Sequence, residues 1–275
     1  MQFLRLVRSF RRTAVKPFSA PLMGIMVLVA GSEILLAQNA PSNPPAAWHA
    51  WRGPHGNGIA ATQQVPPPVS FGQDKNVLWQ APIPGRGHSS PIVVGDLVLL
   101  TTADEARQIQ SVLAYRRETG ELVWRRNVHE GGFNPKIHAK NTHASSTLAS
   151  DGKHVYAVFN NRKRIIVSKL SMSGNVVWQK PAGDYLPIKY QFGYAASPVL
   201  HHGRVIVVAD FEKTGYLAAL DSGTGEIVWR TARPDQISFS SPIIARTGGR
   251  EQLLLSGGAQ ISSYDPETGE ALWSA

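Results

Sequence analysis

The stretch Ala219-Leu-Asp-Ser-Gly-Thr-Gly-Glu-Ile-Val-Trp229 decides the fold, because shorter copies of it recur along the chain. Three other segments end alike: Glu118-Thr-Gly-Glu-Leu-Val-Trp124, Met172-Ser-Gly-Asn-Val-Val-Trp178 and Glu267-Thr-Gly-Glu-Ala-Leu-Trp273. Their tryptophans are spaced 54, 51 and 44 residues apart along the sequence, and Trp79 precedes the first of them by 45. Self-similarity at a period of about 40–50 residues is typical of an array of like structural units.

Each repeat divides into four short β-rich runs separated by turn residues. In the third repeat the runs are Ser197–Leu200, Arg204–Asp210, Gly215–Asp221 and Ile227–Arg230. The repeats also open alike, at Ser90-Pro, Ser146-Thr, Ser197-Pro and Ser241-Pro. Four strands per repeat predict a blade of a β-propeller, and no helical periodicity is visible after the N-terminal segment. We therefore expect an all-β fold of about four four-stranded antiparallel blades.

The recurring turn and tryptophan have a physical role in such a blade. Glycine permits the positive φ of a tight hairpin, and the neighbouring hydroxyl can bond the turn's own backbone. The tryptophan begins the outer strand and brings a large apolar face, with an N–H donor, to the seam between blades. The residues predicted to form this docking motif are Ala114, Gly120, Trp124, Gly174, Trp178, Ala219, Asp221, Thr224, Gly225, Trp229, Asp265, Thr268, Gly269 and Trp273.

Over residues 76–275 these copies resemble the tryptophan-docking motif of pyrroloquinoline-quinone (PQQ) type, or quinoprotein-type, β-propellers. The first copy has Arg116 where the motif has aspartate, the second is one residue shorter, and the fourth has Ser263 for the alanine. The segments 51–58, 140–146 and 150–156 also resemble secreted bacterial PQQ-binding-like repeat proteins, which are common in planctomycetes. The resemblance implies a ring of seven or eight blades.

About four blades are therefore expected to form a partial ring. The resemblance implies that the strand around Trp79 would complete the last blade of a closed ring. Since propellers close radially to protect their edges, the sequence predicts a truncated product or fragment, unless two half-rings associate. Light scattering separates these cases, and a monodisperse monomer would count against an open ring.

The N-terminus is typical of an export signal. A basic stretch up to Lys16 precedes the apolar run 22–30, and small residues lie near an expected cleavage after Ala37 or Ala40. We assign 1–37 to a signal peptide, 38–75 to a Pro/Gly-rich leader and 76–275 to the partial propeller. The protein is expected in the periplasm or outside the cell. An uncleaved anchor, and either the general or the twin-arginine route (Arg11-Arg12), stay open.

Composition limits the classes of function. The 275 residues contain no cysteine, which excludes a disulfide and a lipid-modified N-terminal cysteine. The formal net charge is +9, but five basic residues lie in the signal segment and the others are scattered, so nucleic-acid binding is not expected. Membrane contact is expected only through an uncleaved signal segment.

No residue pattern predicts a catalytic, cofactor-binding or metal-binding residue. The histidines at 129, 138, 143, 154, 201 and 202 match no metal-ligand spacing, and His201 and His202 are expected to point to opposite sides of a hairpin. Asp221 and Asp265 are expected to bond turn backbone rather than to form an acid/base pair. The polar run from Lys136 to His143 lines the channel or one face of the ring, or is a solvated loop.

Two main functions follow from the resemblance. Quinoprotein dehydrogenases hold PQQ with calcium or a lanthanide, use an acidic base, and many have a vicinal disulfide. This chain lacks cysteine and has no identifiable ligands for that cofactor. We therefore expect a binding or scaffold module, like the outer-membrane-protein assembly lipoproteins that share the fold, with envelope proteins or a small-molecule or polymer ligand as partner. The alternative is a fragment of a PQQ-dependent alcohol or sugar oxidoreductase, and a carbohydrate-binding module is a third hypothesis.

Overall fold

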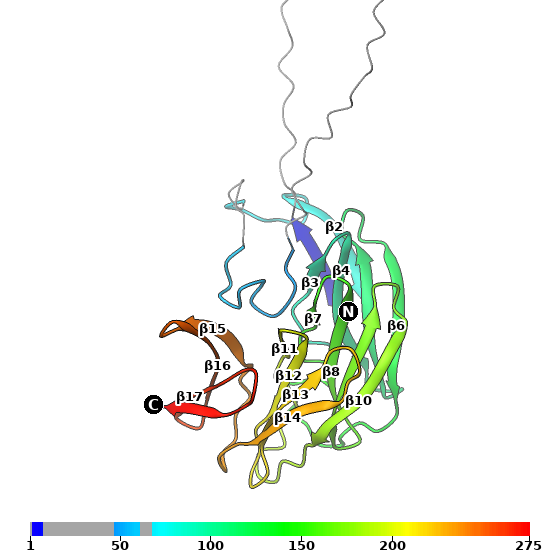
Figure 1. Cartoon of the computed structure of the whole chain (residues 1–275). Helices are drawn as coiled ribbons and strands as arrows, with labels where there is room; N and C mark the ends of the chain where they lie inside the picture. Colours follow the sequence, from blue (N-terminus) through cyan, green and yellow to red (C-terminus); the bar gives the residue numbers. More distant parts are fainter. Residues whose placement is uncertain (1, 8–46, 61–67) are drawn as a thin grey trace, which may run out of the picture.

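The computed structural model describes residues 2–7, 47–60 and 68–275. Within these residues all regular structure is β-strand, β1 to β18 in chain order (Figure 1). None of the described residues forms a helix long and apolar enough to cross a membrane. The expected all-β class is confirmed.

Sixteen strands form four antiparallel sheets of four, each built from strands that follow one another in sequence. The first sheet holds β3 (Ile92–Val94), β4 (Leu97–Asp104), β5 (Ile109–Arg116) and β6 (Leu122–Glu130), and the second β7 (Ala149–Ser150), β8 (His154–Asn161), β9 (Arg164–Ser171) and β10 (Val176–Asp184). The third holds β11 (Val199–His201), β12 (Arg204–Ala209), β13 (Tyr216–Asp221) and β14 (Ile227–Ala232), and the fourth β15 (Ile243–Thr247), β16 (Arg250–Gly257), β17 (Gln260–Tyr264) and β18 (Ala271–Ser274). The four predicted blades are confirmed, and the strands of the third begin and end within two residues of the predicted runs.

The middle strands of the first three blades are largely buried on both faces, because neighbouring blades, or β2 (Val77–Ile83) beside the first blade, cover both. In the fourth blade, β16 and β17 keep exposed residues. Six consecutive residues of β4 and of β5 are buried, whereas the outer strand β6 is mostly exposed. The core accordingly lies in the seams. One cluster of buried side chains extends over the second, third and fourth blades, another joins the first to the second, and a third joins β2 to the first.

The N-terminal part contributes a separate pair of strands. β1 (Gln2–Val7) runs antiparallel to β2 (Val77–Ile83). Because β2 pairs with β1, the strand around Trp79 does not complete the fourth blade in this structure. Most of the predicted signal segment, residues 8–37, lies outside the described residues, as do residues 38–46 and 61–67 of the predicted leader.

Residues 47–60 of the leader run along the inner edge of the blades (Figure 1). Trp48 exchanges two 2.9 Å backbone hydrogen bonds with Val93 of β3, and the backbone N–H of Ser150 donates to the carbonyl of His49 at 2.9 Å. The leader is therefore attached to the innermost strands of the first two blades.

The two ends of the blades differ. At one end, here called the loop face, the long loops 131–148, 185–198 and 233–242 join one blade to the next. Backbone hydrogen bonds tie these loops to the turns between the second and third strands, including Tyr185 N to Lys163 O and Arg233 N to Gly215 O, both at 2.8 Å. At the other end, the turn face, the first hairpin of a blade meets its Thr-Gly turn, as in the 2.8 Å bond from Ser222 N to Gly203 O.

Candidate functional site

The recurring glycine and tryptophan meet across the seams between blades. Trp124 lies against Gly174 of the next blade, and its Nε1 donates to the carbonyl of Met172 at 2.9 Å. The same arrangement pairs Trp79 with Gly120, Trp178 with Gly225 and Trp229 with Gly269, with Nε1 donating to the carbonyls of Arg117, Ser222 and Pro266. A Cβ at any of these glycines would lie within 3.0 Å of the indole, and their φ values are positive, so a side chain would clash with the docked ring.

The aspartates of the docking motif accept hydrogen bonds within their own turns. Asp221 Oδ1 accepts hydrogen bonds from the backbone N–H groups of Gly223 and Thr224 at 2.9 and 2.8 Å, and from the Thr224 hydroxyl at 3.1 Å. The bond from the Thr224 backbone, above all, holds the pKa of Asp221 below its ordinary value. Asp265 Oδ1 likewise accepts from the backbone N–H of Glu267 and Thr268. Both carboxylates therefore organise turns.

The motif alanines stand opposite the tryptophans in the strand register. Ala114 pairs with Trp124, and Ala219 pairs with Trp229. In the fourth blade Ser263 takes this place opposite Trp273. Trp273 itself differs from the other motif tryptophans, because it is 41% exposed and its Nε1 donates to Gln252 Oε1 of its own blade at 2.8 Å.

The short segments with which the repeats begin contact one another at the inner edges of the blades. The backbone N–H of Ser90 donates to Thr147 Oγ1 at 2.9 Å, that of Thr147 to Ser197 Oγ at 3.0 Å, and that of Ser197 to Ser241 Oγ at 2.8 Å. Each hydroxyl thus satisfies the first backbone donor of the preceding blade. This series of hydrogen bonds holds the inner strands of neighbouring blades side by side.

An exposed apolar surface occupies the loop face, where three loops meet. We call it the aromatic patch; its side chains are 38–60% exposed and belong to Leu186, Ile188, Tyr190, Phe192 and Phe239. The rings of Phe192 and Phe239 stack with centroids 5.8 Å apart, and Tyr190 lies 5.5 Å from Phe192. His138, from the preceding loop, packs edge-on against Phe192.

The loop that bears the aromatic patch is anchored. The carboxylate of Glu212 accepts hydrogen bonds from the backbone N–H of Ile188 at 3.0 Å and of Lys189 at 2.7 Å. Asn141 Nδ2 donates to the carbonyl of Phe192 at 2.6 Å, and the hydroxyl of Tyr185 donates to the carbonyl of Gly193 at 3.2 Å. The backbone that carries the exposed patch side chains is therefore held in place.

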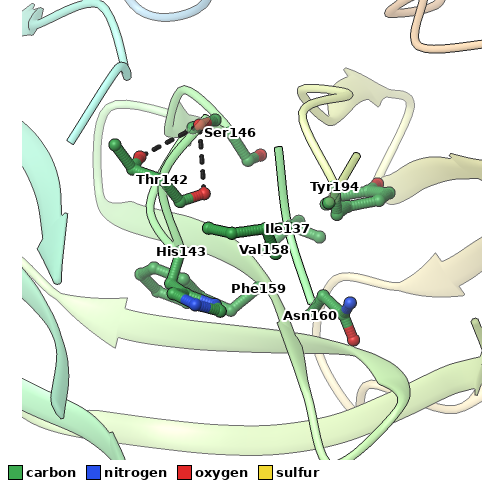
Figure 2. Close-up of a pocket in the computed structure, with 10 residues that line it drawn as sticks. Ile137, Thr142, His143, Ser146, Val158, Phe159, Asn160 and Tyr194 are labelled. Atoms are coloured by element: carbon green, nitrogen blue, oxygen red, sulfur yellow. Dashed lines mark hydrogen bonds between the residues drawn. The ribbon is translucent and has the colours of Figure 1, made fainter. Parts of the chain in front are cut away.

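A small cavity lies below the polar run predicted at Lys136–His143. Figure 2 shows Thr142 and Ser146 on one side of it and Tyr194 on the other, with Val158 between them. Its volume is about 10 Å³, the space that one water molecule needs, so it excludes an organic ligand. The polar run belongs to the loop face, and its Asn141 and His138 contact the patch loop.

The larger opening is an axial groove between the leader and the inner strands. It has a volume of about 830 Å³ and is lined by residues 49–57, 149–150, 197–201, 241–246 and 251. This is the position in which the family resemblance implies a quinone with a calcium or lanthanide ion. Calcium takes about six to eight oxygen ligands, including several carboxylates.

The residues lining the groove do not fit that ion. Among them Glu251 supplies the one carboxylate and Asn57 the one side-chain amide, while His49, His55 and Arg246 add nitrogen or positive charge. Glu251 is moreover 3.9 Å from His201 Nε2. This donor set favours neither calcium nor a lanthanide.

The expectation that His201 and His202 point to opposite sides is wrong. Their rings lie together, with centroids 3.9 Å apart and planes at 30°. His202 has a φ of +40° in the hairpin turn, so the alternation of an extended strand does not hold there. Both rings face Glu267, at 3.1 Å from His201 Nε2 and 2.9 Å from His202 Nδ1.

The other histidines noted in the sequence do not belong to the His201–His202 cluster. His129 is partly buried against the edge of Phe159, and this burial, with a smaller effect of Arg162, lowers its pKa to about 4. His143 packs against the ring of Phe133, and His154 pairs with Asp151 at 3.5 Å.

Comparison with known proteins identifies the family of the repeat. The family model described as "Outer membrane protein assembly factor BamB" matches residues 47–185 and 108–275. A curated protein with that same description, from Burkholderia pseudomallei, is 25% identical over 210 aligned positions, and the alignment covers 74% of this chain and 48% of the relative. The quinoprotein ethanol dehydrogenase of Pseudomonas putida is 26% identical over 302 aligned positions, gaps included, covering 93% of this chain and 45% of the relative.

The chain thus spans about half the length of these curated relatives. Among solved structures, BamB from Moraxella catarrhalis superimposes with a TM-score of 0.51 at 14% identity, covering 72% of this chain and 54% of that one. At this identity the likeness supports the propeller fold alone.

Proposed function

Because the chain belongs to the PQQ-like repeat family whose model is described as outer membrane protein assembly factor BamB, we propose that it is an exported protein-binding module that acts in the assembly of outer-membrane proteins. In this proposal residues 1–37 direct export, residues 38–75 form the leader and residues 76–275 form the binding module. The partner is a protein of the cell envelope.

The observation that supports this proposal best is the aromatic patch. Large exposed apolar patches on soluble proteins mark interaction surfaces, and aromatic side chains are enriched among the residues that dominate binding energy. Phe192 and Phe239 come from loops on two successive blades, and the Glu212 and Asn141 contacts hold the intervening backbone in place. A pre-organised surface binds with a smaller entropic cost than a loose one.

We infer that the partner places an apolar segment on the aromatic patch. Lys189 lies over the ring of Tyr190 at 5.2 Å, and Lys136 and Lys140 belong to the neighbouring loop 131–148. An apolar segment with flanking acidic residues would complement this arrangement of rings and positive charge.

The experiment compares the mature chain with a patch variant in capture from envelope extract of the native host. The double variant Tyr190→Ser, Phe192→Ser removes two central rings. Its matched control, Val176→Ser, Val177→Ser, removes two aliphatic side chains of similar exposure from outer strand β10. The proposal predicts that a specific envelope protein is recovered with wild type and control, and about tenfold less with the patch variant. Equal recovery by all three would refute it.

The oxidoreductase alternative has a separate test. The purified chain is mixed with PQQ and calcium, and absorbance and dye-linked alcohol oxidation are recorded. The proposed binding role predicts neither a bound chromophore nor turnover. Turnover that depends on PQQ would favour the dehydrogenase relationship instead.

A further inference from the structure

Four side chains from two blades converge at the turn face, beside the axial groove. His201 and His202 end β11 and begin the turn to β12, Glu251 lies near the start of β16, and Glu267 lies in the Thr-Gly turn of the fourth blade. These residues lie 49 to 66 positions apart between the blades, so only the packing of the third blade against the fourth brings them together. The docking motif and the aromatic patch use none of these side chains.

The geometry is that of a ligand set rather than a single ion pair. One ligand atom each of His201, His202 and Glu251 can lie within 4.8 Å of the other two. Glu251 Oε2 is 3.9 Å from His201 Nε2 and 3.8 Å from His202 Nε2. Two ligand atoms on a tetrahedral zinc ion are about 3.3 Å apart, given bonds of about 2.0–2.2 Å, so the Glu251 oxygen must approach each nitrogen by roughly half an ångström to reach that geometry.

The fourth side chain contacts both imidazoles. Glu267 Oε1 lies 2.9 Å from His202 Nδ1 and 3.1 Å from His201 Nε2, and its other oxygen is bound by the Arg204 guanidinium. An ion on His201 Nε2 would replace the contact of that nitrogen with Glu267, whereas the contact with His202 Nδ1 would remain. A carboxylate that accepts the Nδ1–H of a histidine leaves Nε2 free as a ligand, which is the usual outer-shell arrangement of histidine metal sites. His202 Nε2 then faces Glu251.

We propose that His201 Nε2, His202 Nε2 and Glu251 Oε2 bind a divalent transition-metal ion of the zinc type, with Glu267 as the positioning residue for His202. Imidazole nitrogens with one carboxylate suit zinc and its neighbours, whereas calcium and magnesium prefer oxygen ligands throughout. His202, Glu251 and Glu267 are exposed, so the ion can enter from solvent.

The bound ion would join the third blade to the fourth. Two ligands come from the β11–β12 hairpin and one from β16, so the ion would add a cross-link to the side-chain packing and the Glu267 contacts that already join these blades. An ion that binds only the folded chain raises its thermal stability in proportion to the logarithm of the ion concentration above the dissociation constant. This inference is independent of the proposed function, because no patch residue takes part.

The test titrates the tag-free mature chain with Zn²⁺ alone by calorimetry, and with Co²⁺ while visible absorption is recorded. We expect one ion per chain, a rise in melting temperature with Zn²⁺, and Co²⁺ d–d bands with the intensity of a four-coordinate site. His202→Ala and Glu251→Gln should each weaken binding by about 100-fold or more. Because both side chains are exposed, circular dichroism of these variants should match wild type.

A matched control removes a histidine–carboxylate pair elsewhere. His154 lies beside Asp151 on the second blade, so His154→Ala should leave zinc binding unchanged. Calcium should not compete with zinc at equal concentration. The proposal is overturned if wild type binds no zinc at millimolar concentration, or if His202→Ala and Glu251→Gln bind it as tightly as wild type and His154→Ala do.

Discussion

At the scale of single residues, the seam between blades depends on the contact of one tryptophan ring with one glycine, which has no side chain. Trp178 packs on Gly225 and donates to the carbonyl of Ser222, and the same pairing recurs at three other seams. The sequence pattern predicts which residues recur but not their partners. That each tryptophan contacts the glycine of the following repeat, instead of its own, is seen only in the structure.

The docked tryptophans should matter more to stability than the exposed one. Trp178 is 9% exposed and Trp273 is 41% exposed. Trp178→Ala should lower the free energy of unfolding by about 3–5 kcal/mol, because it leaves a cavity and an unpaired carbonyl at a packed seam. Trp273→Ala should cost less than about 1 kcal/mol, measured in both variants by urea denaturation. Equal losses would contradict the docking role.

His129 should make the fold sensitive to mild acid. The histidine has an ordinary pKa of 6.5 in the unfolded chain, and burial lowers the pKa of His129 to about 4 in the fold. Protonation therefore favours the unfolded chain as the pH falls below 6.5, and about 3 kcal/mol of stability should be lost by pH 4. Above pH 6.5 this contribution is constant.

The measurement for His129 is the urea midpoint at several pH values between 7 and 4.5. Carboxylates also titrate toward the lower end, so the comparison is with His129→Gln, which cannot bind the proton. We expect the variant to lose less stability than wild type over this interval. Parallel curves for the two proteins would show that His129 does not titrate as described.

The pair His201-His202 marks the limit of sequence reasoning at this scale. Alternation along a strand places neighbours on opposite sides, but His202 lies in a turn at positive φ, and its ring returns to the side of His201. Their carboxylate neighbours belong to another blade. No spacing rule along the chain relates residues brought together by packing of two repeats.

At the scale of elements, a buried ion pair connects the third blade to the loop that follows it. Arg233 donates from Nε to Asp210 Oδ1 at 2.9 Å and from Nη2 to Asp210 Oδ2 at 3.1 Å, and both side chains are almost wholly buried. Arg233 also bonds the Tyr264 hydroxyl of the fourth blade. Burial raises the pKa of Asp210, and its bonds with Arg233 oppose that rise.

Breaking this pair on one side should be severe. Arg233→Met leaves the Asp210 carboxylate buried without its partner, and the free energy of unfolding should fall by about 3–5 kcal/mol in urea denaturation. The double variant Asp210→Leu, Arg233→Met removes both charges and should recover much of that loss. If the single variant were as stable as wild type, the pair would not connect the blades as described.

The aromatic patch is also an element-scale feature that the sequence conceals. Tyr190 and Phe192 lie in one loop and Phe239 in another, and none belongs to the repeated motif. Loops vary between repeats, so the repeated sequence pattern predicts the strands and turns of the blades. It gives no information on the surface that the loops form. An aromatic residue in a loop is informative only once its neighbours across the blades are known.

At the scale of the whole molecule, the architecture follows from repetition. Each blade has two faces to bury, and a like unit can cover a face, so four copies of one pattern were enough to predict four four-stranded antiparallel sheets. In the described residues, the polar and charged side chains around the axial groove do not repeat from blade to blade in this way. The axial groove is lined by residues from the leader and three inner strands, and its poor fit to calcium became apparent only from that lining.

The central claim is that the loop face binds an envelope protein, and photo-crosslinking tests it most directly. A benzophenone amino acid replaces Phe192 in one protein and Val177 on outer strand β10 in another, both expressed in the native host and irradiated in intact cells. The account predicts a crosslink from position 192 to a protein of outer-membrane assembly or to an outer-membrane protein, with none from position 177. No crosslink at 192, or the same products from both positions, would contradict it.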